Sequence, residues 1–153
     1  MNKFFEADVK GQNKVLPVLR NMFSGYNTRV EPHFDDYSAI DIYMSASTSS
    51  TLYKYAIECK DRDMSHDKYD SYILEDSKRE KLLEAFKEGY KPIYINTFTD
   101  GYMVVWDLST IDFNDCAELK ALLPATTVEY GAKKNKKNKL LKIEDSKCIV
   151  KMK

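Results

Sequence analysis

An acidic residue stands two positions before a lysine at the end of an apolar stretch, in Glu58-Cys59-Lys60. A carboxylate can ligate a metal ion, and a lysine ammonium beside it can bind a phosphate oxygen or orient a water molecule. The same acid-x-Lys spacing occurs at five places in this chain. Such a short motif therefore identifies no site by itself, and its surroundings must distinguish this copy from the others.

Two predicted strands surround this copy. Residues 52–60 alternate, so that one face is apolar (Tyr53, Tyr55, Ile57 and Cys59) and the other holds Ala56, Glu58 and Lys60. Residues 38–44 alternate too, with Asp41 between Ile40 and Ile42. The short Ser/Thr-rich link between them predicts an antiparallel pair, on which Asp41 and Glu58 converge.

Two converging carboxylates on apolar strands are costly unless they are paired or bound to a cation. Their hard oxygen atoms suit Mg²⁺ or Mn²⁺. Two interpretations stay open: a metal centre with Lys60 beside it, or an architectural ion pair of Lys60 with Asp41 or Glu58. Buried ion pairs are seldom a net gain in stability, which favours a functional role.

Two helices are predicted near these strands. The first covers about residues 13–23, with Asn13 as its cap, Pro17 in its first turn and Gly25 at its end. The second follows an apparent capping box formed by Ser77 and Glu80. Both carry apolar residues at helical spacing.

Further strands are predicted at 92–98 and 102–106, joined by a hairpin at Asp100-Gly101. The connection from Lys60 to residue 92 is long enough for a helical crossover, which makes these two strands parallel. The C-terminal stretch predicts one or two added strands. The sequence therefore predicts an α/β fold around a mixed sheet.

The segments 39–43 and 55–62 together resemble the D…ExK signature of the PD-(D/E)xK nuclease superfamily. The likeness includes the element order and covers about residues 3–108. It implies a restriction-endonuclease-like α/β/α sandwich and a single nuclease-like domain over 1–153, with C-terminal strands and a Lys-rich loop in 109–153. Two features depart from the family: Ile40 replaces its proline, and a QxxxY helix motif is absent.

This resemblance implies a Mg²⁺- or Mn²⁺-dependent deoxyribonuclease. Asp41, Glu58 and the backbone carbonyl of Cys59 would ligate the metal, and Lys60 would position the attacking water. Many members have a further glutamate in the first helix, for which Glu6 is the candidate here. The alternative is a catalytically inactive nucleic-acid-binding or protein-interaction module on the same fold.

Basic residues gather toward the C-terminus: residues 131–153 hold nine Lys against one Glu and one Asp. Because clustered lysines gain affinity from counterion release, this segment predicts either a polyanion contact or a solvated hairpin loop. The candidate contacts to DNA, or to RNA, are Lys133, Lys134, Lys136 and Lys137, with Lys78 and Arg79 on the second helix. For those last two, solvated helix positions are the favoured interpretation. By analogy with small enzymes of this fold, a homodimer is also expected.

The remaining features concern the compartment. No apolar run approaches the length of a membrane helix, and the N-terminus becomes acidic at Glu6, too early for a signal peptide. The three cysteines stand at wide spacings without a CxxC pattern. Free thiols in a reducing compartment follow, so we expect a cytoplasmic protein without a membrane partner.

Overall fold

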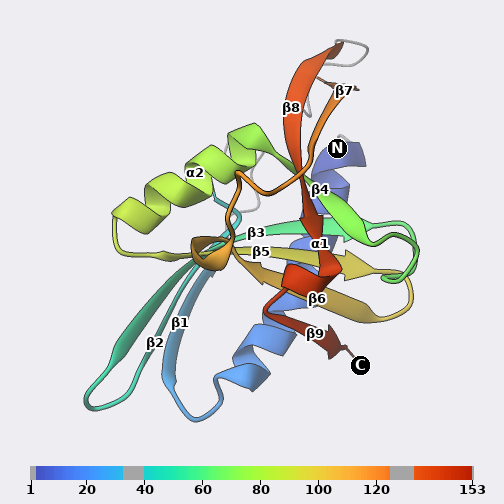
Figure 1. Cartoon of the computed structure of the whole chain (residues 1–153). Helices are drawn as coiled ribbons and strands as arrows, with labels where there is room; N and C mark the ends of the chain where they lie inside the picture. Colours follow the sequence, from blue (N-terminus) through green and yellow to red (C-terminus); the bar gives the residue numbers. More distant parts are fainter. Residues whose placement is uncertain (1–2, 33–39, 125–132, 153) are drawn as a thin grey trace.

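The computed structural model describes residues 3–32, 40–124 and 133–152, with the side chains of 3–8, 119–124 and 133–137 left out. In these ranges the chain is α/β, with two α-helices and two sheets (Figure 1). The helices are α1 (Lys3–Met22) and α2 (Asp76–Lys87). The main sheet has the order β1 (Asn27–Pro32), β2 (Ile42–Ser47), β3 (Leu52–Arg62), β5 (Lys91–Phe98), β6 (Tyr102–Asp107) and β9 (Cys148–Lys151). The smaller sheet has the order β4 (Ser71–Glu75), β8 (Lys133–Lys142) and β7 (Glu118–Pro124).

Strand β3 lies in the middle of the main sheet. It pairs antiparallel with β2, which places Ile42 opposite Ile57, and parallel with β5, which places Ile57 opposite Ile93. The other pairs of this sheet are antiparallel. The predicted mixed sheet, the antiparallel pair and the helical crossover into a parallel strand are all confirmed.

The two helices cover opposite faces of the main sheet. Alternation along β3 sends Ile57 and Cys59 into the core beneath α1, and Ala56 into the core beneath α2. Each core is closed by apolar residues of its own helix, which are Val15, Leu16 and Leu19 on α1 and Leu82 and Ala85 on α2. Burying each large aliphatic side chain contributes about 1.5–3 kcal/mol, so the two cores hold β3 firmly from both sides.

The prediction for the first helix was wrong at its N-terminus. Helix α1 begins at Lys3, and Pro17 lies in its interior rather than in its first turn. Gly11 and Gln12 break the apolar pattern in the sequence, yet both are buried. A Cβ added at Gly11 would meet the Asp61 backbone nitrogen at 3.4 Å, so a residue without a side chain continues the packed stripe there.

Several boundaries also differ from the prediction. Strand β2 begins at Ile42, so Asp41 lies in a bend just ahead of it. Helix α2 begins at Asp76 after Glu75, whose side chain makes no capping hydrogen bond, so the predicted Ser77/Glu80 capping box is wrong. Strands β1 and β4 were not predicted, because they are short and carry polar residues that are exposed or half-buried, four of six in β1 and two of five in β4.

The C-terminal segment contributes three strands instead of one or two. Strands β7 and β8 extend the smaller sheet, and β9 completes the edge of the main sheet beside β6. The lysine run expected in a loop begins strand β8 at Lys133, and residues 125–132 before it lie outside the described residues.

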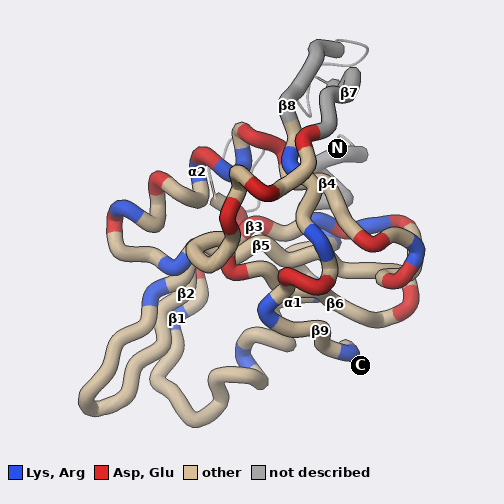
Figure 2. The backbone as a smooth tube through the Cα atoms, in the orientation of Figure 1, with Lys and Arg blue, Asp and Glu red and all other residues tan. Residues whose placement is uncertain are grey.

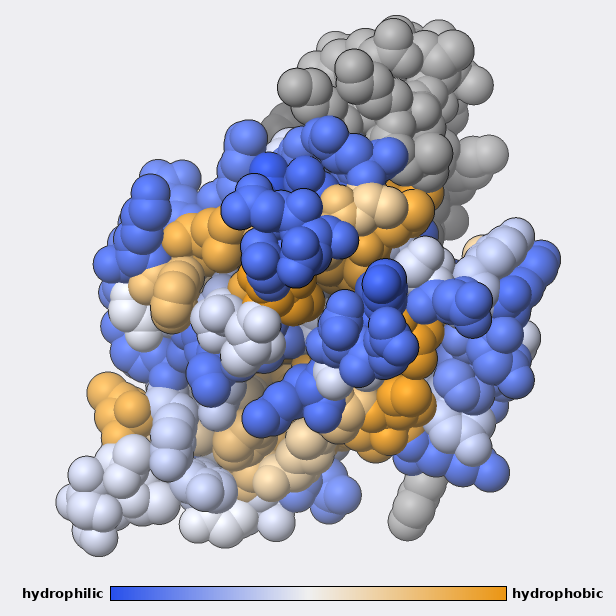
Figure 3. Space-filling model, viewed as in Figure 1, coloured by the Kyte–Doolittle hydropathy of each residue, from blue (hydrophilic) through white to orange (hydrophobic). Residues whose placement is uncertain are grey.

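The surface seen in Figure 3 is mostly hydrophilic, with hydrophobic residues reaching it in separate patches. Neither described helix has the length and apolarity needed to cross a membrane.

Candidate functional site

Asp41 and Glu58 are brought together by the pairing of β2 with β3. Ile42 is opposite Ile57, so the same register carried one residue further sets Asp41 opposite Glu58. Although Asp41 precedes the strand, the Cys59 backbone N–H donates a hydrogen bond of 2.9 Å to its Oδ2. A specific backbone contact therefore holds the Asp41 carboxyl beside Glu58.

Both carboxyl groups are removed from water. Glu58 is 2% exposed and Asp41 is 8% exposed. The Lys78 Nζ of α2 lies 3.4 Å from Glu58 Oε2. Glu58 Oε1 is buried and has no hydrogen-bond partner among the described residues. One oxygen of a desolvated carboxylate is thus left for a ligand, a proton or a cation.

Burial raises the pKa of Glu58 well above its ordinary value, the charge of Asp41 raises it further, and Lys78 opposes this rise. Burial also raises the pKa of Asp41, against the Cys59 hydrogen bond and the charge of Lys78. Desolvation thus outweighs the nearby positive charge at both groups. Without a further cation, the pair retains a proton at higher pH than exposed carboxyl groups do.

Lys60 lies two residues beyond Glu58 on the same face of β3, but it is exposed. It makes no hydrogen bond or ion pair with another described residue, although its charge is felt at Asp41. Most of the charged residues of β3 lie toward this end of the strand (Figure 2). The structure therefore brings together Asp41 and Glu58, with Lys60 at the surface beside them.

These residues fit a hard divalent cation. Carboxylate oxygens are the ligands that Mg²⁺ and Mn²⁺ prefer, and the unpartnered Glu58 Oε1 supplies one such donor beside Asp41. In a strand the N–H and C=O of one residue point to the same side. Because the Cys59 N–H points to Asp41, its carbonyl is directed to that side as well.

Of the other predicted site residues whose side chains the structure describes, Lys78 contacts this pair and Arg79 does not. Glu6 lies within α1, but its side chain is outside the described residues, as are those of Lys133, Lys134, Lys136 and Lys137. The Arg79 Nε is 3.3 Å from Asp76 Oδ1, and its guanidinium lies 5.1 Å from the centre of the Phe113 ring. Arg79 therefore stabilises the first turn of α2 and contacts Phe113. Lys78, for which a solvated position was favoured, instead ion-pairs with Glu58.

A polar network that the sequence pattern did not predict lies further along the same face of β3. The Arg62 Nε donates to Asn96 Oδ1 at 2.7 Å, and its Nη2 donates to the Ile73 carbonyl at 2.7 Å. The buried Tyr94 hydroxyl donates to the same carbonyl at 3.1 Å. This network ties β3 and β5 to β4 next to the carboxylate pair. The only available signal was that Arg62 continues the alternation of Glu58 and Lys60.

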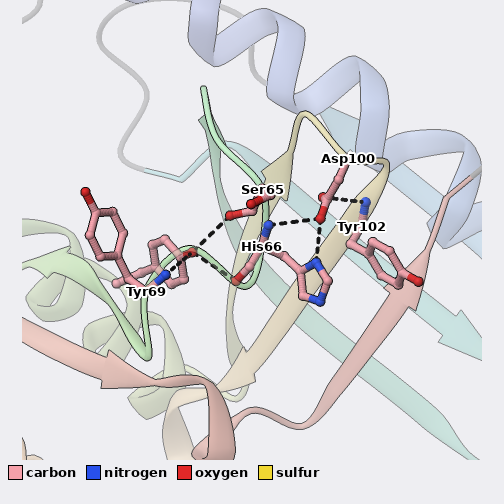
Figure 4. Close-up of polar contacts among 6 residues, drawn as sticks. Ser65, His66, Tyr69, Asp100 and Tyr102 are labelled. Atoms are coloured by element: carbon pink, nitrogen blue, oxygen red, sulfur yellow. Dashed lines mark hydrogen bonds and ion pairs between the residues drawn. The ribbon is translucent and has the colours of Figure 1, made fainter.

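A second acidic cluster contains His66, Asp67 and Asp100, whose ligand atoms lie within 4.8 Å of one another. His66 Nδ1 is 2.6 Å from Asp100 Oδ2, which also accepts from the His66 backbone N–H at 3.1 Å (Figure 4). The Tyr102 N–H reaches Asp100 Oδ1 at 3.4 Å, and the Tyr102 ring lies 4.2 Å from that of His66.

Burial acts to raise the pKa of Asp100, but the His66 hydrogen bonds outweigh it and lower that pKa. Both Asp100 oxygens are therefore engaged by the protein. This cluster joins the 63–70 connection to the β5–β6 turn, and the Asp41/Glu58 pair is the stronger candidate metal centre.

Comparison with known proteins finds no matching family model, no matching curated protein and no matching solved structure.

Proposed function

We propose that the protein is a metal-dependent nuclease that hydrolyses DNA phosphodiester bonds at Asp41, Glu58 and Lys60. One observation carries this function: the buried Glu58 Oε1 has no described partner, while Asp41 lies opposite and Lys60 is exposed on the same strand face. A buried carboxylate pair with an unpartnered oxygen lowers the stability of the fold, and it is suited to binding a cation.

A restriction-endonuclease-like α/β/α sandwich in a single domain is part of the same proposal. It is supported by a helix on each face of a mixed sheet, and by one carboxylate on β3 beside another that directly precedes the neighbouring strand β2. It is supported too by the α2 crossover into the parallel strand β5.

In this function Asp41, Glu58 and the Cys59 carbonyl would hold Mg²⁺ or Mn²⁺. The bound cation would lower the pKa of a water molecule and act as a Lewis acid on the phosphate. Lys60 would orient the attacking water and neutralise charge as the new P–O bond forms and the ester P–O bond breaks, the departing oxygen taking a proton from solvent. Glu6 would add a carboxylate from α1.

DNA is the proposed partner, and its phosphates would be contacted, without any reading of its sequence, by four lysines of β8: Lys133, Lys134, Lys136 and Lys137. A homodimer would present two such sites to two strands. A cytoplasmic location is proposed on the three cysteines, all of which are free thiols.

The test compares cleavage of supercoiled, linear, branched and single-stranded DNA, and of RNA, with Mg²⁺ or Mn²⁺. Asp41→Asn, Glu58→Gln and Lys60→Met should each lower activity by more than the roughly 10–100-fold typical of residues outside the ligand shell. Glu84→Gln and Lys81→Met, at exposed positions of α2, are the matched controls and should retain activity. Full activity in all three site variants would refute the assignment.

The Lys78–Glu58 ion pair supports a second candidate, an inactive binding module in which this pair is architectural. In that case no substrate is cleaved with either metal, and nucleic-acid or protein binding survives Glu58→Gln. Binding that is lost with the β8 lysines would then assign the contact to that strand.

A further inference from the structure

Lys78 occupies an unusual place for a lysine. It lies in the first turn of α2, where the positive end of the helix dipole disfavours a cation. Its ammonium group nevertheless lies 3.4 Å from Glu58 Oε2. The two buried carboxyl groups attract a positive charge, and this attraction explains why a lysine is held at the start of α2.

The two partners differ in their freedom to move. The Glu58 side chain is 3% exposed, whereas that of Lys78 is 37% exposed. A lysine has a flexible four-carbon stem, so its ammonium can leave Glu58 for solvent while α2 stays in place. Glu58, in the centre of β3, cannot follow it. The ion pair therefore opens at the lysine.

We propose that Lys78 is the resident counter-cation of the Asp41/Glu58 pair, that a divalent cation displaces it, and that the displaced ammonium then binds a DNA phosphate. This role rests on the proposed function, because it assumes that the pair binds metal. It differs from the role of Lys60, which is exposed and makes no ion pair with a described residue.

The first test measures Mn²⁺ binding by the full-length protein at about pH 8.5, using the electron paramagnetic resonance signal of free Mn²⁺. Removing a charge a few ångströms from the cation should tighten binding about tenfold or more in Lys78→Met. Lys78→Arg keeps the charge and should match the wild type. Lys81→Met, one turn along α2, is the control for removing a lysine from this helix.

Displacement is supported if Lys78→Met binds Mn²⁺ more tightly than wild type while Lys78→Arg and Lys81→Met do not. It is supported too if Lys78→Met is the one protein of the four that binds Mn²⁺. Unchanged or weaker binding by Lys78→Met overturns it, provided that circular dichroism and the melting temperature show a folded variant. If neither protein binds Mn²⁺, both the metal centre and this role are refuted. If both bind Mn²⁺ but neither cleaves DNA, only the proposed nuclease function fails.

The second test asks where the displaced ammonium goes. The salt dependence of DNA binding is measured without metal and with Ca²⁺, a hard cation that also takes oxygen ligands. Without metal, Lys78 stays on Glu58, so Lys78→Met and wild type should have equal slopes. With Ca²⁺, the slope of log K against log salt should be steeper for wild type than for Lys78→Met, by the amount expected for about one phosphate contact. Equal slopes in both conditions would overturn the phosphate contact.

Discussion

Glu58 is a carboxylate that the fold keeps almost entirely out of water, and a proton or a cation has to compensate for that. Lys78 compensates in part, since the pKa of Glu58 remains raised in its presence. The free energy of folding therefore depends on which cation or proton neutralises the pair. In the proposed function, metal binding and the stability of the metal-free protein therefore place opposed demands on this residue.

Glu58→Gln should stabilise the metal-free protein increasingly as the pH rises. The folded state raises the pKa of Glu58, so the folded state binds the proton more tightly than the unfolded state does. The associated stability is fully present below the unfolded pKa and is lost as the pH rises through the folded pKa. Glutamine imitates the protonated carboxyl at every pH, so the variant escapes this loss.

Thermal melts of both proteins from about pH 5 to pH 8 measure this difference. One kcal/mol corresponds to about 2–4 °C in a chain of this size, so a gain of a few degrees at the upper end is expected. Saturating Mn²⁺ should reverse the order, because a ligand at a hundred times its Kd adds about 2.7 kcal/mol to the protein that binds it. A gap that shrinks with rising pH would contradict the prediction.

At the residue scale, the sequence predicted the positions that depend on one strand or on two strands joined by a short link. Alternation along β3 places Glu58 and Lys60 on one face, and the short link to β2 places Asp41 opposite. Lys78 could not be assigned in this way. Its contact with Glu58 depends on how α2 is placed over the sheet, and no local spacing records that placement.

At the scale of elements, α1 positions the end of β3 that carries the site. Asp61 receives the Lys14 ammonium at 2.8 Å and the Thr97 hydroxyl at 2.6 Å, on the face opposite Glu58. Gly11 packs against this strand, since a Cβ added there would contact Asp61 and Cys59. The helix therefore contacts β3 directly behind the candidate site.

Substitutions of Gly11 separate two effects on stability, the low helix propensity of glycine and the limited space between α1 and β3. An added Cβ lies 3.4–3.8 Å from its neighbours, which is ordinary van der Waals contact. Gly11→Ala should therefore raise the free energy of unfolding by up to about 0.5–1 kcal/mol, the difference in helix propensity between glycine and alanine. Gly11→Leu should instead lower stability by about 1–3 kcal/mol through overpacking against Asp61 and Cys59.

Urea denaturation measures both changes, with Asn13→Ala as the control for helix propensity at an exposed position of α1. A loss of more than 1 kcal/mol in Gly11→Ala would mean that the helix approaches β3 more closely than the structure indicates.

The strongly apolar or alternating elements were predictable, whereas α1 and the smaller sheet were predicted only in part. The buried stripe of α1 continues through Gly11 and Gln12, two residues that no hydrophobic pattern includes. Strand β8 begins with lysines, which resemble a loop in sequence. It forms a strand because β4 and β7 pair with its two edges.

At the scale of the whole molecule, one core joins the two sheets. Leu74 of β4 and Leu141 of β8 are buried in the same cluster as Trp106 of β6. The Trp106 Nε1 donates a 2.9 Å hydrogen bond to the Lys142 carbonyl. The smaller sheet thus packs against the main sheet through shared apolar contacts, and Arg62 adds a polar link through the Ile73 carbonyl.

Leu74→Ala should therefore destabilise the whole molecule rather than release the smaller sheet alone. Its side chain is 0% exposed, and truncating such a leucine costs about 2–5 kcal/mol. Trp106 is the only tryptophan, so its fluorescence reports the main sheet while far-ultraviolet circular dichroism reports both sheets. Coincident urea transitions at a lower midpoint are expected from both probes.

Leu52→Ala, at a position 63% exposed, is the control and should change stability by less than about 0.5 kcal/mol. A tryptophan transition unmoved by Leu74→Ala, with only the dichroism shifted, would mean that the smaller sheet unfolds on its own.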